Sequence, residues 1–171
     1  NINILFVVIF GGLISIFFLF KPLQFKEQKF TDVPLFELTS FTTYEIDKIG
    51  LITLMLGDNA IRYEDRYVVK NINYTDNSKK YIANMKSNNG IYKEDVVTLR
   101  GDVIYSREDG LTFETDQAVY DKKTSVATTD DVYVAVQNFN TINGSSLEYN
   151  NDLKKIESKN VIVKYQLKEK Q

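Results

Sequence analysis

The chain of 171 residues contains no histidine, no cysteine and no tryptophan, and it has only two prolines. Without His or Cys, a Ser-His or Cys-His nucleophile pair, a His-ligated metal, a zinc cluster and a disulfide are all excluded. Neither sign of charge is in excess, since 21 Lys and Arg stand beside 23 Asp and Glu. A chain without a basic face does not neutralise phosphates, so no nucleic-acid partner is expected. Carboxylate-only chemistry is left, or binding without chemistry.

Charge is absent altogether from residues 1–20. At about 1.5 Å per residue, a helix of this length covers roughly the 30 Å hydrocarbon core of a bilayer. The run ends in Phe-Leu-Phe rather than in small residues of the Ala-x-Ala type, so we expect a retained transmembrane helix and not a cleaved signal peptide. Gly11, Gly12 and Ser15 would let another helix approach closely, or they reflect the ordinary frequency of glycine in membrane helices.

Lys21, Lys26 and Lys29 follow the apolar run. By the positive-inside tendency, these lysines favour a cytoplasmic location for the rest of the chain. The visible charge pattern therefore argues against an exported domain, and taken alone it leaves the orientation open.

We expect residues 21–34 to form a linker and residues 35–171 to form one β domain. No proline follows Pro34, which suits a long sheet because proline cannot donate to the hydrogen-bond ladder. β-branched and aromatic residues alternate in short runs bounded by Gly, Asn or Asp. Examples are residues 52–56 before Gly57-Asp58-Asn59, and residues 97–99 before Gly101-Asp102. No segment after residue 20 has the spacing of an amphipathic helix, so the predicted fold class is all-β.

The second half of the chain contains a near-repeat. Tyr120 and Tyr149 are each followed by a polar turn and then, 12 and 14 residues on, by two valines: Val132 and Val134, and Val161 and Val163. Gly110 and Gly144 open the two copies. We expect strand–turn–strand units that stack on one another, with both glycines in turns at positive φ.

All 11 tyrosines lie after the linker, and most share the parity of aliphatic residues. One interpretation is the core of a sandwich, in which aromatic side chains fill a half-buried pleat. The other is an open apolar groove that holds a lipid. The pattern alone favours the core, although the two interpretations do not exclude each other.

The carboxylates fall mostly in or beside predicted turns, where Asp stabilises the turn backbone. A glycosidase-like carboxylate pair is allowed by number alone. However, the sequence has no calcium loop, no Walker loop and no Gly-x-Ser-x-Gly elbow. We therefore expect neither an enzyme nor a cofactor.

The order of several segments resembles the LptC family, the membrane-anchored periplasmic component of the lipopolysaccharide export machine. The segments are the N-terminal apolar run, residues 33–38, 97–103 and 109–116, and the near-repeat. The resemblance implies an open β-jellyroll of stacked antiparallel strands, preceded by a single N-terminal transmembrane helix. Its apolar interior would hold the acyl chains of lipopolysaccharide, which favours the groove over a plain core.

The resemblance also implies partners and a location. The anchor helix would contact the transmembrane subunits of an ATP-driven exporter, and jellyroll-to-jellyroll contacts would join the domain to a periplasmic bridge protein. The protein would be a single-pass inner-membrane protein with its C-terminal domain in the periplasm, despite the three lysines. A second interpretation is a membrane-tethered adaptor domain that binds only protein.

Candidate site residues follow from this resemblance and from strand parity. The residues expected to contact lipid are those of inward parity: Leu54, Leu56, Leu99, Tyr105, Phe113, Tyr120, Val134, Tyr149 and Val163. The residues expected to contact partners lie in the anchor and at the two ends of the sheet, where a strand can be added: Gly11, Gly12, Ser15, Phe36, Leu38, Val161 and Tyr165.

Overall fold

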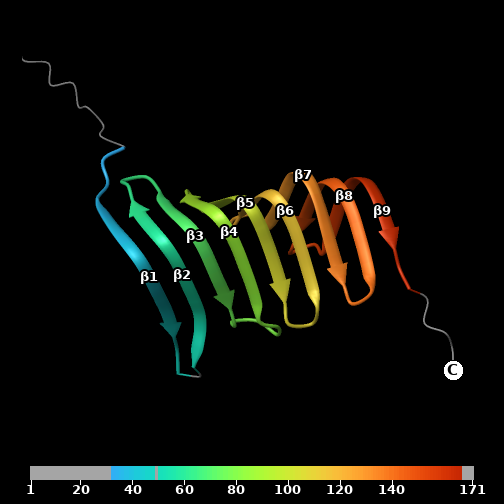
Figure 1. Ribbon diagram of the computed structural model, residues 1–171, viewed down its shortest axis with the longest axis horizontal. Coiled ribbons are helices and arrows are strands. Elements are labelled where there is room, and N and C mark those ends of the chain that lie inside the picture. The colour runs from blue at the N-terminus through green and yellow to red at the C-terminus, as the bar shows by residue number, and fades with distance from the viewer. Residues whose placement is uncertain (1–31, 49, 167–171) are drawn as a thin grey trace, which may run out of the picture. The chain divides into compact units, whose positions relative to one another are not determined.

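The computed structural model describes residues 32–48 and 50–166, which form a single antiparallel sheet (Figure 1). Nine strands follow one another along the chain, and each pairs with the next. Their bounds are β1 Phe36–Ile46, β2 Leu51–Arg62, β3 Tyr67–Asp76, β4 Ala83–Lys93, β5 Val96–Arg107, β6 Leu111–Asp121, β7 Val126–Gln137, β8 Asn140–Asn150 and β9 Lys155–Lys164. The predicted all-β fold class and its antiparallel pairing are confirmed.

The expected transmembrane helix over residues 1–20, with Gly11, Gly12 and Ser15, lies outside the described residues. Across residues 32–48 and 50–166, no helix has the length and apolar character needed to cross a bilayer.

The strands are longer than the sequence pattern indicates. β2 continues without a break through Gly57, Asp58 and Asn59, which we expected to end a strand. β5 likewise continues through Gly101 and Asp102. The turn-forming residues at these places mark a bend within a strand, because pairing with both neighbouring strands resumes on the far side.

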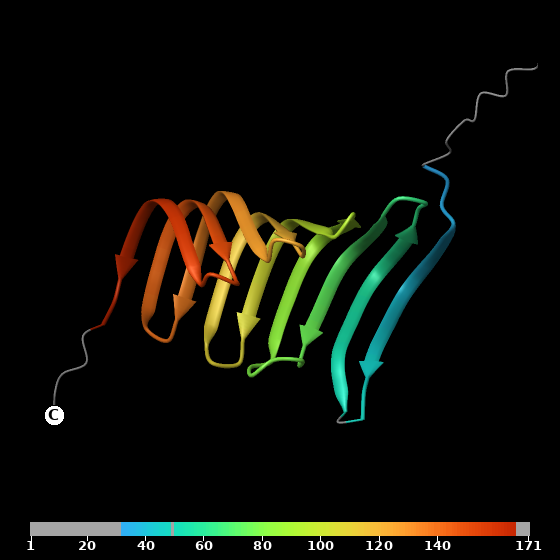
Figure 2. The same cartoon turned by 180° about the vertical axis from the view of Figure 1, so that it is seen from behind.

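These bends line up across the sheet. The pairing register shifts in the middle of four consecutive pairs of strands, from β4–β5 to β7–β8. An extra residue in one strand bends that strand and increases its twist. Positive φ angles occur in the same mid-strand zone, at Ser40, Asn71, Gly101, Asp102, Ser146 and Asn160. We call this line the crease; the curl of β7, β8 and β9 about it is seen from behind in Figure 2.

Side chains from the two sides of the crease meet on one face of the sheet, which we call the inner face. The hydroxyl oxygens of Thr115 and Thr129 lie 3.1 Å apart and are buried. Both residues border register shifts, Thr115 in the β6–β7 pairing and Thr129 in the β7–β8 pairing. The crease is thus closed by direct contacts.

Gly57 provides space on the inner face. A Cβ added at this residue would lie 2.7 Å from the Phe41 ring and 3.1 Å from a methyl group of Val69. Phe41 pairs with Gly57 on one side of the crease, whereas Val69 pairs with Ala60 on the other side. The missing side chain lets an aromatic ring and an aliphatic group from the two sides pack together.

The buried apolar residues are few, and all lie beside the crease: Phe41, Leu99, Val103 and Tyr133. A lone sheet has no second layer to cover its face, so burial is confined to the place where the sheet folds onto itself. Tyr133 is the only buried tyrosine of the 11, all of which are described. The sandwich-core interpretation of the tyrosines is therefore wrong for this sheet.

The near-repeat corresponds to two hairpins, β6–β7 and β8–β9, with polar turns after Asp121 and Asn150 as predicted. Gly110 lies in the β5–β6 turn with φ of 89°, which confirms its expected role. Gly144 was predicted wrongly, because it lies inside β8. Its role is steric: a Cβ there would lie 2.7 Å from the Tyr133 hydroxyl.

Candidate functional site

The inner face carries an apolar row on the side of the crease that leads to the β1–β2 turn. Cross-strand pairing joins its members one after another from β2 to β9: Met55, Tyr74, Met85, Tyr105, Phe113, Ala135, Ile142 and Val163. We call it the methionine row, because it contains both methionines of the chain. Burial raises the pKa of the Tyr74 and Tyr105 phenols, as expected where a hydroxyl group has lost water.

A second row lies on the inner face beyond the crease. Pairing again joins its members from strand to strand: Phe36, Arg62, Tyr67, Tyr92, Val97, Tyr120, Ala127, Tyr149 and Ile156. We call it the tyrosine row. The Tyr92 hydroxyl donates to the Asp95 carboxylate at 3.0 Å, and the Tyr149 hydroxyl donates to the Asn151 side-chain oxygen at 3.3 Å. This row is amphipathic, with aromatic rings on the inner face and hydroxyl groups directed to the turns.

The two rows face the same side of the sheet because contacts across the crease join them. The Phe113 and Tyr133 rings stack with centroids 5.3 Å apart, so the methionine row continues into the buried contacts of the crease. The Tyr133 hydroxyl in turn lies 2.8 Å from that of Ser158. Ser158 lies in β9 two residues from Ile156, a member of the tyrosine row.

A pocket of about 310 Å³ lies on the inner face near the C-terminal end of the methionine row. Ala135 is the smallest member of this row and stands between Phe113 and Ile142 in the pairing, which leaves the space. The lining is mainly apolar, with two amide side chains: Leu111, Ala135, Val136, Gln137, Asn140, Ile142, Val163 and Tyr165. We call it the inner pocket.

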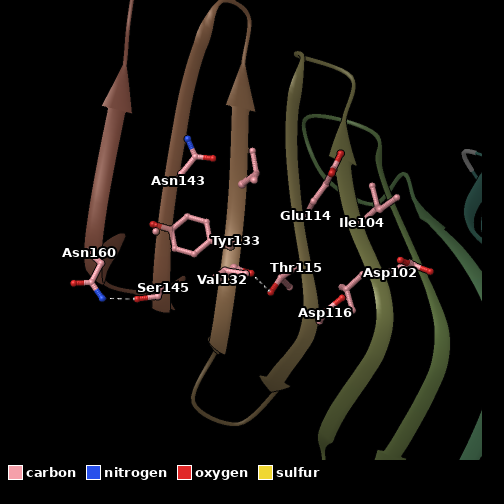
Figure 3. A pocket seen from close by; sticks show the side chains of 13 residues that line it. Asp102, Ile104, Glu114, Thr115, Asp116, Val132, Tyr133, Asn143, Ser145 and Asn160 are labelled. Carbon is pink, nitrogen blue, oxygen red and sulfur yellow. Dashed lines mark hydrogen bonds between the residues drawn. The ribbon is translucent and has the colours of Figure 1, made fainter.

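A larger hollow, of about 590 Å³, lies along the crease (Figure 3). Most of its lining faces outward: Val132, for example, is 72% exposed. Its polar groups bond to one another, since the Asn160 amide donates to the Ser145 hydroxyl at 2.9 Å and the Thr115 hydroxyl donates to the Val132 carbonyl at 3.0 Å. Nothing in this lining pairs a nucleophile with a base. We take the smaller inner pocket as the candidate site, because it lies on a continuous apolar row.

The described residues include no group of three or more His, Cys, Asp or Glu side chains that could hold a metal ion. Carboxylates cluster instead in the turns beside the tyrosine row, where ion pairs connect neighbouring hairpins: Asp32–Arg66 at 2.7 Å, Asp65–Arg66 and Asp65–Lys93 at 2.8 Å, and Asp95–Lys123 at 3.4 Å. The hydrogen bond from Lys93 lowers the pKa of Asp65. Such exposed pairs contribute little stability singly, but they order the turns at this edge of the inner face.

Six of the nine residues expected to contact lipid lie on the inner face, in two rows and at the crease. These are Tyr105, Phe113 and Val163 in the methionine row, Tyr120 and Tyr149 in the tyrosine row, and Leu99 at the crease. Leu54, Leu56 and Val134 lie on the outer face, where they pair with Thr75, Asn73 and Glu114. Lipid contact itself stays a prediction for each of these residues.

The residues expected to contact partners within the described sheet lie at its two unpaired edges. Phe36 and Leu38 belong to β1, Val161 belongs to β9, and Tyr165 follows β9 directly. All four are exposed, by 42 to 68%. Their partner contacts also stay a prediction.

The parity argument missed Met55, Tyr74, Met85 and Ile142 in the methionine row, and Tyr67 and Tyr92 in the tyrosine row. A longer period would have found several of them. Tyr92, Tyr120 and Tyr149 are 28 and 29 residues apart, and Met55, Met85, Phe113 and Ile142 are 30, 28 and 29 residues apart. One hairpin occupies this length, so the same row recurs on every second strand.

Comparison with known proteins supplies the family. A family model described as "Lipopolysaccharide-assembly, LptC-related" matches residues 4–165. The match includes all nine strands of the sheet. A search of curated proteins found no match. The family is a component of lipopolysaccharide transport and not an enzyme family, so membership implies a role in that transport. The resemblance first suggested by the order of segments is confirmed: the chain belongs to the LptC family.

Proposed function

We propose that the sheet is an open β-jellyroll whose inner face holds the acyl chains of lipopolysaccharide while the lipid is moved away from the inner membrane. The observation that supports this is the methionine row, which crosses the sheet from β2 to β9 without a charged residue. The inner pocket on the same row offers space next to Ala135. The function requires no covalent chemistry.

The energy of holding such a lipid comes from the hydrophobic effect. Each methylene group removed from water contributes about 0.8 kcal/mol, so several partly covered chains would bind firmly. Passing the lipid on then requires a neighbouring surface of similar affinity, and a direction set by ATP hydrolysis elsewhere. In this proposal the protein receives lipopolysaccharide from the inner-membrane ABC exporter and passes it to a periplasmic bridge protein.

The two sheet edges are the proposed contacts with neighbouring jellyrolls. An unpaired edge offers free N–H and C=O groups to an added strand. Phe36 and Leu38 at β1, with Val161 and Tyr165 at or after β9, place exposed apolar side chains beside these edges. Added strands would extend the inner face into the next protein.

The proposal includes an anchor and a location. Residues 1–20 would hold the protein in the inner membrane, with Gly11, Gly12 and Ser15 against the transmembrane subunits of the exporter. Residues 35–171 would lie in the periplasm. Cysteine labelling of Lys122→Cys and of an added N-terminal cysteine from each side of the membrane tests this orientation.

Photo-crosslinking tests the lipid site. Benzoylphenylalanine replaces Phe113 in the methionine row, and in a matched variant it replaces Val134 on the outer face of the adjacent strand. With the full-length chain in membranes and active export, we expect crosslinks to lipopolysaccharide from position 113 and few from position 134. Equal capture at the two positions would contradict binding on the inner face.

The exposed apolar edges also favour a second function, an adaptor that binds protein partners only. Pull-down of purified lipopolysaccharide by the full-length chain in detergent separates the two functions. The adaptor predicts no lipid bound and an unchanged set of co-purified partners, whereas the transport function predicts lipid bound and released to a downstream jellyroll.

A further inference from the structure

The two rows of the inner face differ in how their aromatic residues are held. In the methionine row, Tyr74 and Tyr105 are partly buried among methionine and phenylalanine in the pairing. In the tyrosine row, two hydroxyls are hydrogen bonded to turn residues, as described above, and two rings carry a cation. The guanidinium of Arg62 lies 5.3 Å from the Tyr67 ring centroid, and the ammonium of Lys122 lies 4.4 Å from the Tyr92 centroid.

The two cations converge on one place. The Tyr67 and Tyr92 rings are neighbours, with centroids 6.2 Å apart. Arg62 comes from the end of β2 and Lys122 from the β6–β7 turn, so residues distant in sequence meet at these rings. Cation–π contacts hold a cation against a ring without neutralising its charge. We call these four residues the Arg62–Lys122 cluster.

The charges of this cluster are not neutralised by protein. Within the described part of the chain, neither Arg62 nor Lys122 forms an ion pair, although Lys93 and Lys123 close by do so. The cation nearest the methionine row is different. Arg107, two residues beyond Tyr105, binds both oxygens of Asp109 at 2.7 and 2.6 Å. An anionic group beside the inner face therefore finds available positive charge at the tyrosine row and not at the methionine row.

We propose that the lipid lies in one orientation on the inner face, with its acyl chains on the methionine row and its phosphorylated sugar headgroup at the tyrosine row, where the Arg62–Lys122 cluster binds phosphate. Arg and Lys bind phosphate oxygens through charge-assisted hydrogen bonds. The rings of Tyr67 and Tyr92 present apolar faces to the C–H face of a sugar and keep their hydroxyls wet. This inference rests on the proposed function and adds the direction in which the lipid lies.

The first test removes charge from either partner. The probes are purified lipopolysaccharide and the same lipid after enzymatic removal of its phosphates, bound to the full-length chain in detergent. We expect Arg62→Gln with Lys122→Gln to weaken binding of the phosphorylated lipid by about tenfold per lost phosphate contact, and to leave the dephosphorylated lipid unaffected. The matched control is Lys79→Gln with Lys80→Gln in the β3–β4 loop, which should leave both affinities unchanged.

The second test locates the acyl chains. Lipopolysaccharide with a photoreactive group near an acyl terminus is crosslinked to the wild-type chain, and the modified peptides are identified by mass spectrometry. Modification of the methionine row, around Met55, Met85 and Phe113, supports the orientation. Equal modification of peptides around Tyr67 and Tyr120 would overturn it, as would an equal loss of affinity for both lipids in the first test. Failure of the wild-type chain to bind either lipid would instead reject the proposed function, and the orientation with it.

Discussion

The side-chain hydroxyls of Tyr133 and Ser158 lie 2.8 Å apart, although the two residues belong to β7 and β9 and are separated by the whole of β8. The Tyr133 side chain reaches across Gly144, which has no side chain to block it. This hydrogen bond therefore joins two strands that have no backbone pairing with each other, and it does so across the crease.

Replacement of Tyr133 by Phe tests this connection. The ring and its stacking on Phe113 are kept, so the expected loss is that of one buried hydrogen bond, about 0.5–1.5 kcal/mol in the free energy of unfolding. Urea denaturation of the full-length chain in detergent, followed by circular dichroism, measures it. Tyr44→Phe is the control, because Tyr44 is 63% exposed. Equal losses in the two variants would show that the Ser158 contact contributes nothing.

Gly57 and Gly90 form a matched pair for the packing at the crease. An alanine at Gly57 would place its methyl group 2.7 Å from the rigid Phe41 ring, whereas at Gly90 the nearest atom, on Leu99, is 3.5 Å away. We expect Gly57→Ala to cost about 1–3 kcal/mol through overpacking. Gly90→Ala should be neutral or slightly stabilising, since alanine has less freedom than glycine in the unfolded chain. Similar denaturation midpoints for both variants would contradict the steric role of Gly57.

The pH dependence of stability should be flat near neutrality and should fall in acid. Without histidine, no side chain has an ordinary pKa between about 5 and 8. Hydrogen bonds from Lys93, Tyr92 and Arg107 lower the pKa of Asp65, Asp95 and Asp109 respectively. A carboxylate with a lowered folded-state pKa stabilises the fold above its ordinary value of about 3.9, and this contribution is lost as the pH falls through the folded-state pKa.

Urea midpoints between pH 3 and pH 8 check this behaviour. The expected profile is constant from about pH 5.5 to 8 and declines below about pH 4.5. Asp109→Asn should reduce the acid decline, because it removes one carboxylate whose pKa differs between the folded and unfolded chain. A midpoint that changes between pH 6 and pH 7 would show that some other group controls stability.

Ile162 and Val163 separate the two faces at the exposed edge. Both residues belong to β9 and are more than half exposed, so a polar replacement of either one should be tolerated by the fold. Val163 lines the inner pocket, while Ile162 pairs with Asn143 on the outer face. We expect Val163→Gln to lower lipopolysaccharide binding severalfold, since a buried valine contributes about 1.5–3 kcal/mol, and Ile162→Gln to leave it unchanged. An equal effect of both would indicate an edge contact with protein instead.

Local sequence chemistry predicted the hairpins but not the crease. The turn after Asp121 was predictable because its carboxylate bonds the backbone N–H groups of Lys123 and Thr124, a contact within the turn itself. Gly57-Asp58-Asn59 has the same composition as a turn. It became a bend because β2 pairs with both β1 and β3 on each side of it, and no local rule contains that pairing.

The same bend explains the errors in assigning the inner face. Leu54 and Val134 are larger and more apolar than many inward residues, and aliphatic character suggested that they face inward. Their neighbours Met55 and Ala135 hold the inner positions instead. Alternation is also interrupted at the crease: in β6, Phe113 and Thr115 keep the period of two, and Tyr120 then belongs to an inward row five residues further on. Parity counted from one half of a strand therefore fails in the other half.

Because every strand pairs only with its neighbours in sequence, the sheet is a linear array with no closing contact between its first and last members. Adjacent strands in a sheet stand about 4.8 Å apart, so each hairpin lengthens the array by about 9.6 Å and repeats both inner rows once. The distance over which a bound lipid can be carried is then set by the number of hairpins, and natural or engineered chains can change that distance by whole hairpins without altering the cross-section that fits the lipid.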